Sequence, residues 1–256
     1  MTSLLFRDFK QVAFISPHPD DVELCCGMLI TRLIDSNVKV IYFGITDGAP
    51  STKTLLQINH LPKDYRRYTY KKTRRQETIN ALSLLGITTD QIRFFDFPDL
   101  ECYKSIPALI FNFSKILKTV DSIFCCPFEG GHPDHDICRF ALAIAIKKMN
   151  YSGKIFEYAS YNSIGYQVFE SNLPKSFSIV ANAKERKIKK QVSQIFVSQK
   201  EEAKLFRNDI EFFRQMSTTF VVDKFFSYPI KPYYEQWAYS RSIVLKEIQN
   251  YLKSTF

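Results

Sequence analysis

The chain has 256 residues, which is enough for one medium-sized domain with a sizeable hydrophobic core. Hydrophobic residues make up 45% of it, and 35 Lys and Arg against 26 Asp and Glu give a formal net charge of +9. No apolar run approaches the roughly 18 residues of a membrane span, so the sequence argues against an integral membrane protein.

Short apolar runs alternate with amphipathic stretches along the first 160 residues. In chain order they predict a strand over Gln11–Ser16, a helix over Glu23–Asp35, a strand over Val38–Thr46, a helix over Thr73–Leu85, a strand over Ile92–Phe95, a helix over Ile106–Val120, a strand over Ser122–Cys126, a helix over Asp136–Met149 and a strand over Lys154–Ala159. This alternation implies right-handed crossovers and a mostly parallel sheet with helices on both faces. The expected fold class is therefore α/β.

The remaining segments are less regular. Residues 49–70 are polar and are expected to form a long loop, which contains His60 in an exposed position. Lys184–Phe213 is rich in charge and is expected to be helical, whereas the last forty residues are aromatic and mixed. Because no repeat, low-complexity segment or linker interrupts the chain, we expect a single domain over residues 1–256.

The six cysteines have no CxxC spacing, and the two adjacent pairs, Cys25–Cys26 and Cys125–Cys126, are poorly placed to form disulfides within each pair. The N-terminal residues MTSLLFRDFKQV lack the long apolar stretch of a signal peptide. We therefore expect reduced, buried thiols in a cytoplasmic protein.

Three of the four histidines fall in two related tetrapeptides, His18-Pro19-Asp20-Asp21 and His132-Pro133-Asp134-His135. Each tetrapeptide follows the end of an expected buried strand. In an open parallel sheet, ligands bind at the loops that leave the carboxyl ends of the strands. Two loops that lie more than a hundred residues apart in the sequence can therefore converge on one crevice.

The residue types of these tetrapeptides suit a catalytic metal. Imidazole and carboxylate groups are usual ligands of catalytic zinc, which keeps three protein ligands and one position for water. His18, Asp21 and His135 would supply such a set, with Zn²⁺ as the expected cofactor and Fe²⁺, Co²⁺ or Mn²⁺ as open alternatives. Asp20 and His132 would remain beside the metal as the base and the electrophilic group that hydrolysis needs.

A plain turn is the competing interpretation, because Pro restricts the backbone and Asp caps a following helix. Two such motifs, each between a strand and a helix, favour the metal site over two coincidental turns. A capping role for Asp20 or Asp21 remains compatible with either interpretation.

At these residues the chain resembles the PIG-L/LmbE-like family of zinc-dependent de-N-acetylases. SPHPDDVELCCGMLI is similar to the family's first block and GGHPDHDICRFA to its second. Two shorter blocks also fit, Arg74-Arg75-Gln76-Glu77 and Phe97-Pro98-Asp99. Near the end, Val197-Ser198-Gln199 and Tyr234-Glu235-Gln236-Trp237 stand where the family carries similar patterns.

The resemblance implies a Rossmann-like fold and hydrolysis of the N-acetyl group of an amino sugar of the GlcNAc type, with a nucleotide- or lipid-linked sugar among the options. It makes the two histidines and the aspartate named above the zinc ligands, Asp20 the general base, and a protonated His132 the group that faces the developing oxyanion. It also assigns Arg74 and Asp99 to the substrate's hydroxyls or phosphate, although such residues are equally common on an ordinary surface.

Several alternatives stay open at this level. The basic stretch Lys63–Arg75 would attract a phosphate or would simply be solvated. A nucleic-acid-binding module that uses the interleaved residues Tyr65, Arg66, Arg67, Tyr68 and Tyr70 would explain the charge but not the histidine motifs, so nucleic acid is not the expected partner. A hydrolase of another amide, such as a thiol conjugate or a longer acyl chain, is the main alternative, and a homo-oligomer is neither indicated nor excluded.

Overall fold

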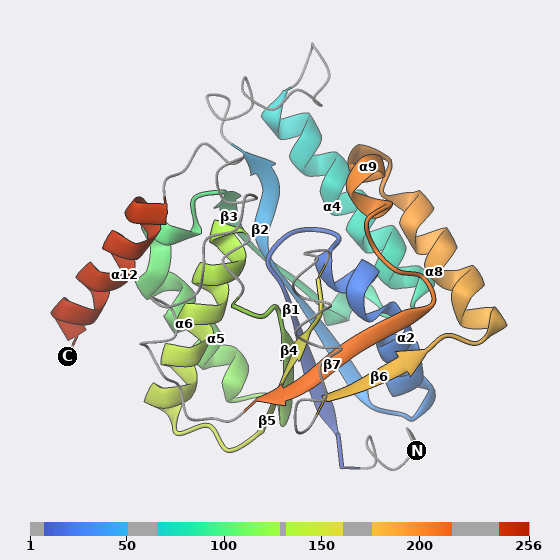
Figure 1. Cartoon of the computed structure of the whole chain (residues 1–256), viewed down its shortest axis with the longest axis horizontal. Helices are drawn as coiled ribbons and strands as arrows, with labels where there is room; N and C mark the ends of the chain where they lie inside the picture. Colours follow the sequence, from blue (N-terminus) through green and yellow to red (C-terminus); the bar gives the residue numbers. More distant parts are fainter. Residues whose placement is uncertain (1–7, 51–65, 129–131, 161–175, 217–240, 256) are drawn as a thin grey trace.

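A central sheet organises the part of the chain that the structure describes (Figure 1). The computed structural model describes residues 8–50, 66–128, 132–160, 176–216 and 241–255. Within these ranges seven strands pair in the order β3-β2-β1-β4-β5-β7-β6. Five strands pair in parallel: β1 (Gln11–Ser16), β2 (Lys39–Pro50), β3 (Ile92–Asp99), β4 (Ser122–Cys125) and β5 (Lys154–Tyr158). Strand β7 (Ile210–Met216) pairs antiparallel with both β5 and β6 (Ser176–Val180).

Helices cover both faces of this sheet, as Figure 1 shows. One layer consists of α2 (Asp21–Asp35), α4 (Arg67–Leu84) and α8 (Ala183–Ile195), which pack on one another. The other consists of α5 (Ile106–Leu117), α6 (Pro133–Met149) and α12 (Arg241–Thr255). Short helical turns lie in the connections between strands and helices: η1 (Thr89–Gln91), η2 (Cys102–Ser105), η3 (Val197–Gln199) and α9 (Lys200–Ala203). The expected mostly parallel α/β sheet with two helical layers is confirmed.

A ladder of stacked phenylalanines aligns the central strands. Phe14 of β1, Phe124 of β4 and Phe156 of β5 are direct neighbours in the strand register. Their ring centroids lie 4.9 and 4.7 Å apart with nearly parallel planes. Because a one-residue slip would turn every ring to the opposite face, this ladder fixes the register. The carboxyl ends of β1 and β4 therefore lie at the same edge, where the two histidine motifs follow.

The expected helix over Lys184–Phe213 is wrong in its second half. Helix α8 ends at Ile195, and residues 210–216 instead form strand β7 between β5 and β6. The reason is the alternation in this stretch, which buries Glu211 and Phe213 on one side of β7. Cross-strand pairing with Tyr158 and its neighbours then outweighs the helical preference of the charged residues before it.

Other boundaries shift in the region next to the site. Strand β2 runs on to Pro50, past its expected end at Thr46, and α4 begins at Arg67 inside the expected loop. His60, the rest of that loop and the block at 234–237 lie outside the described residues.

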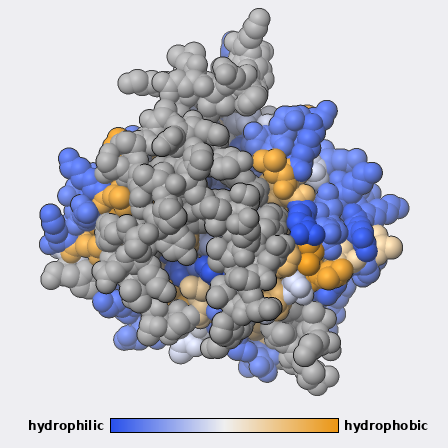
Figure 2. Space-filling view, in the orientation of Figure 1, coloured by the Kyte–Doolittle hydropathy of each residue, from blue (hydrophilic) through white to orange (hydrophobic). Residues whose placement is uncertain are grey.

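All six cysteines are free and buried, as expected. None of the described helices combines the length and the apolar character that crossing a bilayer requires. The outward faces of α4 and α8 are largely hydrophilic, as the blue surface at the right of Figure 2 shows.

Candidate active site

The two histidine motifs meet at the carboxyl ends of β1 and β4. His18 lies in the loop after β1, Asp21 is the first residue of α2, and His135 lies in the first turn of α6. His18 Nδ1 is 3.2 Å from Asp21 Oδ2 and 3.2 Å from His135 Nε2, and His135 Nε2 is 3.1 Å from Asp21 Oδ2. Three atoms that can bind a metal, two from the HPDD motif and one from the HPDH motif, thus form a small buried triangle.

This triangle fits a single metal ion. Ligand atoms that lie about 2.1 Å from a tetrahedral ion are about 3.4 Å from one another, close to the three separations found here. Two imidazole nitrogens and one carboxylate oxygen are also the donor types of a catalytic zinc site. His18, Asp21 and His135 are therefore the residues that would hold the metal.

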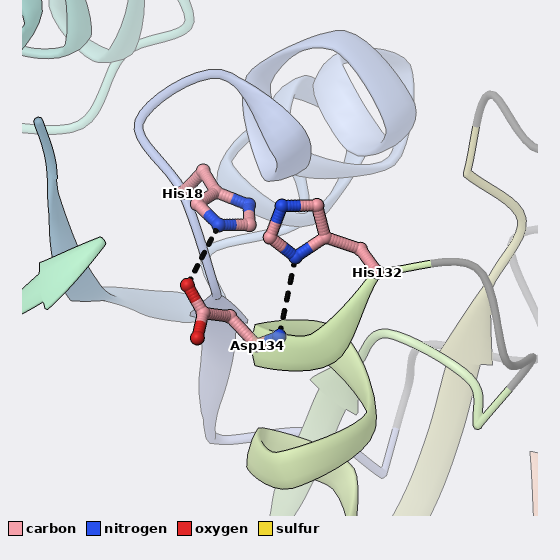
Figure 3. A group of neighbouring side chains, drawn as sticks. All are labelled: His18, His132 and Asp134. Atoms are coloured by element: carbon pink, nitrogen blue, oxygen red, sulfur yellow. Dashed lines mark hydrogen bonds and ion pairs between the residues drawn. The ribbon is translucent and has the colours of Figure 1, made fainter. Parts of the chain in front are cut away.

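Two further carboxylates stand behind His18. Its Nε2 lies 3.2 Å from Asp99 Oδ1 and 3.3 Å from Asp134 Oδ2, and Figure 3 shows the second of these contacts. A proton on Nε2 leaves Nδ1 as the nitrogen that faces Asp21 and His135, as metal-ligating histidines require. Burial lowers the pKa of His18, but the surrounding carboxylates outweigh this effect and raise the pKa well above its usual value.

Asp134 ties this arrangement to the loop that follows β3. It is fully buried at the start of α6 and accepts hydrogen bonds from the backbone N–H groups of Leu100 (2.6 Å) and Cys102 (3.1 Å). The sequence assigns no separate role to Asp134, and its place between the two histidines of the HPDH motif is the one local signal that marks it.

His132 caps helix α6 with its ring. Its Nδ1 accepts a hydrogen bond from the backbone N–H of Asp134 at 3.1 Å (Figure 3), and the residue has the extended backbone of an N-cap. Burial and the nearby His18 and His135 lower the pKa of His132 well below its usual value. A protonated His132 stays a prediction, whereas the acceptor role of Nδ1 and the lowered pKa both favour a neutral ring with Nε2–H as its donor.

Asp20 lies beside the triangle in an unusual backbone conformation. Its φ of 123° is positive, and its side chain makes no capping bond to α2. The carboxylate instead pairs with Arg74, whose Nη2 is 2.9 Å from Asp20 Oδ2. Burial raises the pKa of Asp20 to about 7, against the opposing effect of the Arg74 charge. A carboxyl that titrates near neutral pH is suited to exchanging protons with a substrate.

The two residues that the resemblance assigns to the substrate are both engaged by the protein. Arg74 is buried against the HPDD loop, and Asp99 is buried beside His18. Burial opposes ionisation of Asp99, but His18, His132 and Arg74 hold its pKa below the usual value. Both side chains border the site, so their contact with a substrate remains a proposal.

The basic stretch that leads into α4 is largely neutralised by acids at the strand ends. Arg67 pairs with Asp47, Arg75 pairs with Asp96, and Lys71 lies within 3.6 Å of Asp47 and 3.4 Å of Asp96. These ion pairs clamp α4 over β2 and β3. They give most of the described positive charges of this stretch a structural partner, which weakens both the phosphate and the nucleic-acid interpretations.

One buried acid near the site, Glu23, is not marked by the sequence as a functional residue. Glu23 of α2 is completely buried, and neither carboxylate oxygen has a hydrogen-bonding partner among the described residues. Burial raises the pKa of Glu23 well above its usual value, with Asp20 and Asp21 adding to the effect. Nothing in the local sequence distinguishes Glu23 from the exposed acids that commonly occupy the first turn of a helix.

The α/β sheet and the His–Asp–His triangle at the carboxyl ends of its strands are together those of a metal-dependent hydrolase. A protein-family model described as PIG-L, GlcNAc-PI de-N-acetylase, matches residues 13–146, just over half of the chain. The chain therefore belongs to the PIG-L family, as its resemblance to that family implied.

One relative and two solved structures are similar to this chain. The diacetylchitobiose deacetylase of Thermococcus kodakarensis (strain ATCC BAA-918 / JCM 12380 / KOD1) is 30% identical over 153 residues, or 58% of this chain and 52% of that protein. The match thus spans about half of the relative's length. The N,N′-diacetylchitobiose deacetylase from Pyrococcus horikoshii superposes with a TM-score of 0.61 at 22% identity over 90% of each chain. The A40926 pseudoaglycone deacetylase Dbv21 superposes with a TM-score of 0.64 at 18% identity, over 84% of this chain and 100% of its own.

The fold by itself does not define the reaction. The 4-carboxy-2-hydroxymuconate hydratase GalB from Pseudomonas putida KT2440 superposes with a TM-score of 0.60 at 12% identity, over 83% of this chain and 98% of its own. That protein is described as a hydratase. The family match and the residues of the site therefore carry the assignment to the deacetylases.

Proposed function

We propose that the protein is a zinc-dependent deacetylase that hydrolyses the N-acetyl group of a GlcNAc-type amino sugar, releasing acetate and a free amine. The observation that carries this proposal is the buried triangle of His18, Asp21 and His135 with the carboxylate of Asp20 beside it. The diacetylchitobiose deacetylase relative supports an acetylated amino sugar as the substrate class.

The residues around the triangle have separable chemical roles. Bound zinc would supply a Lewis acid that polarises the amide carbonyl and lowers the pKa of water. Asp20 accepts the proton of the attacking water and returns it to the departing nitrogen. His132 donates from Nε2 to the carbonyl oxygen as that oxygen gains negative charge, and such a donor contributes about 3 kcal/mol to the transition state. The balanced reaction consumes one water and one amide and yields a carboxylate and an amine.

The remaining features of the proposal concern the chain as a whole. Strands β6 and β7 join the same sheet, and helices α8 and α12 pack in its two helical layers, which supports a single domain. Six free, buried thiols are consistent with the proposed cytoplasmic location. Arg74 and Asp99 border the site closely enough to be tested as substrate contacts.

The test combines metal analysis with product detection on one preparation. Purified protein is analysed for metal by mass spectrometry, and acetate release is followed with N,N′-diacetylchitobiose, N-acetylglucosamine and UDP-N-acetylglucosamine. About one zinc per chain with acetate release, both lost in His18→Ala, is the expected result. Bound metal without acetate release from these sugars would indicate that the substrate is another amide. A protein that binds no metal even after reconstitution would refute the metal site.

A further inference from the structure

We propose that Arg74 is a positioning residue that holds the carboxylate of Asp20 in place, rather than a residue that binds the substrate. This inference rests on the proposed function, because it concerns the group that would act as the general base. It also replaces the role that the family resemblance alone would assign to Arg74.

The two terminal nitrogens of the Arg74 guanidinium contact acceptors of the HPDD loop and of β2. Nη2 donates to the carbonyl oxygen of Pro19 and lies 2.9 Å from Oδ2 of Asp20, and Nη1 lies 3.4 Å from the carbonyl oxygen of Gly48. One nitrogen thus joins the backbone before Asp20 to the side chain of Asp20 itself. Arg74 is only 5% exposed, so a substrate would have to displace these acceptors to bind the same N–H groups.

Asp20 needs such support because its backbone is strained. A φ of 123° with a ψ of −32° is a combination that residues with a side chain rarely adopt. Among the described residues, Arg74 is the hydrogen-bonding partner of the Asp20 carboxylate, through Oδ2. Oδ1 is thereby left as the oxygen that can exchange a proton.

Gly48 makes room for this contact. Its φ is +62°, and a Cβ atom at this position would lie 2.7 Å from Cδ of Pro19 and 3.0 Å from Nε of Arg74. Any side chain would push the arginine and the HPDD loop apart, so a glycine is required here for both its conformation and its size.

The part of the chain beyond residue 160 braces helix α4 behind Arg74. Glu77, one turn further along α4, accepts hydrogen bonds from the backbone N–H (2.9 Å) and the hydroxyl of Ser198. Gln199 donates to the hydroxyl of Tyr70, whose ring lies 5.9 Å from the Arg74 guanidinium carbon. The η3 turn therefore fixes α4 on both sides of Arg74, which gives the Val197-Ser198-Gln199 block a physical role.

The test separates positioning from substrate binding by the kinetic parameter that changes. In Arg74→Gln we expect kcat for acetate release to fall about 100-fold, as a base misplaced by about 1 Å predicts, with KM within about threefold of the wild type and the metal retained. Arg74→Lys keeps the charge but cannot hold Pro19 and Asp20 together. Its kcat should therefore lie between the values of the wild type and of Arg74→Gln. The adjacent Arg75→Gln, which breaks the pair with Asp96, is the matched control with unchanged kcat.

A second measurement does not depend on activity. Urea unfolding of the metal-free wild type, Arg74→Gln, Asp20→Asn and the double variant forms a double-mutant cycle. Direct contact predicts that the midpoint shifts of the two single variants are not additive. Additive shifts, or a KM that rises tenfold or more while kcat is preserved, would overturn the positioning role. If the wild type itself released no acetate, the proposed function would fail while the cycle would still decide the contact.

Discussion

Lys189 of α8 and Glu211 of β7 form an ion pair that is inserted against the backbone of helix α2, with Nζ 2.8 Å from Oε1. Glu211 accepts hydrogen bonds from the N–H groups of Met28 (2.9 Å) and Leu29 (3.0 Å), and Lys189 donates to the carbonyl of Leu24 (2.7 Å). A regular helix joins such N–H and carbonyl groups to each other. The pair therefore fixes α2 one turn after the residues that would bind metal.

Removing one partner of this pair should be costly. Glu211→Ala leaves the Lys189 ammonium buried without its counter-charge, and we expect the free energy of unfolding to fall by about 3–5 kcal/mol. The double variant Lys189→Met/Glu211→Gln should lose less. Glu201→Ala, which removes an exposed pair with Lys204, is the control and should change stability by less than about 1 kcal/mol. Urea denaturation measures all four proteins, and a Glu211→Ala midpoint like that of the control would contradict the expectation.

Two histidines three residues apart should respond differently to replacement. His135 belongs to the triangle of metal-binding atoms, whereas His132 lies outside it and accepts a hydrogen bond from the backbone N–H of Asp134. His135→Ala should lose both metal and activity. His132→Ala should keep the metal and lose roughly 100- to 1,000-fold in kcat, because one donor to the oxyanion is missing. Metal analysis with parallel kinetics checks this, His60→Ala serves as the histidine control, and equal metal loss in both site variants would refute the division of roles.

The buried carboxyl of Glu23 should make stability depend on pH. Its folded pKa is raised, so the unfolded chain ionises first as the pH rises above the usual value of 4.5. Folding stability then falls with rising pH until the folded pKa is reached. Glu23→Gln has no carboxyl to titrate at this position. The free energy of unfolding of the variant, relative to that of the wild type, should therefore rise between about pH 5 and pH 8, by up to about 1.4 kcal/mol per pH unit. Denaturation curves across that range decide it, and a constant difference between the proteins would show that Glu23 does not titrate there.

The six buried thiols should report unfolding. Burial raises the pKa of most of them, including Cys25, Cys26 and Cys102, and so suppresses the reactive thiolate. We expect no rapid reaction with Ellman's reagent in the native protein and reaction of all six after denaturation. A thiol that reacts within seconds in native buffer would show that one of these cysteines is accessible.

The core of the site was predictable because its signals are local. HPDD and HPDH each stand between a strand and a helix, and parallel pairing brings the ends of such strands to one edge. The convergence of His18, Asp21 and His135 thus required only the order of the elements. The aromatic ladder through Phe124 then fixes the register on which this convergence depends.

The residues that support the site were not predictable in this way. The bond from Asp134 to Leu100 and the salt bridge from Arg74 to Asp20 join segments tens of residues apart, so no spacing within one segment indicates them. The charged residues of Lys184–Phe213 predict a helix, but the alternation of buried residues around Glu211 forms strand β7 instead. In each case tertiary packing selects the partner, and local propensity does not encode it.

The ion pair inserted against α2 also bears on where the protein can be divided. The family match ends at residue 146, but the groups that bind the backbone of α2 stand at positions 189 and 211. A chain trimmed to the region of recognisable ancestry would expose the Leu24 carbonyl and the Met28 amide and would lose the strand that carries Glu211. The segment that matches the family model therefore lacks the two side chains that bind the backbone of its own first helix.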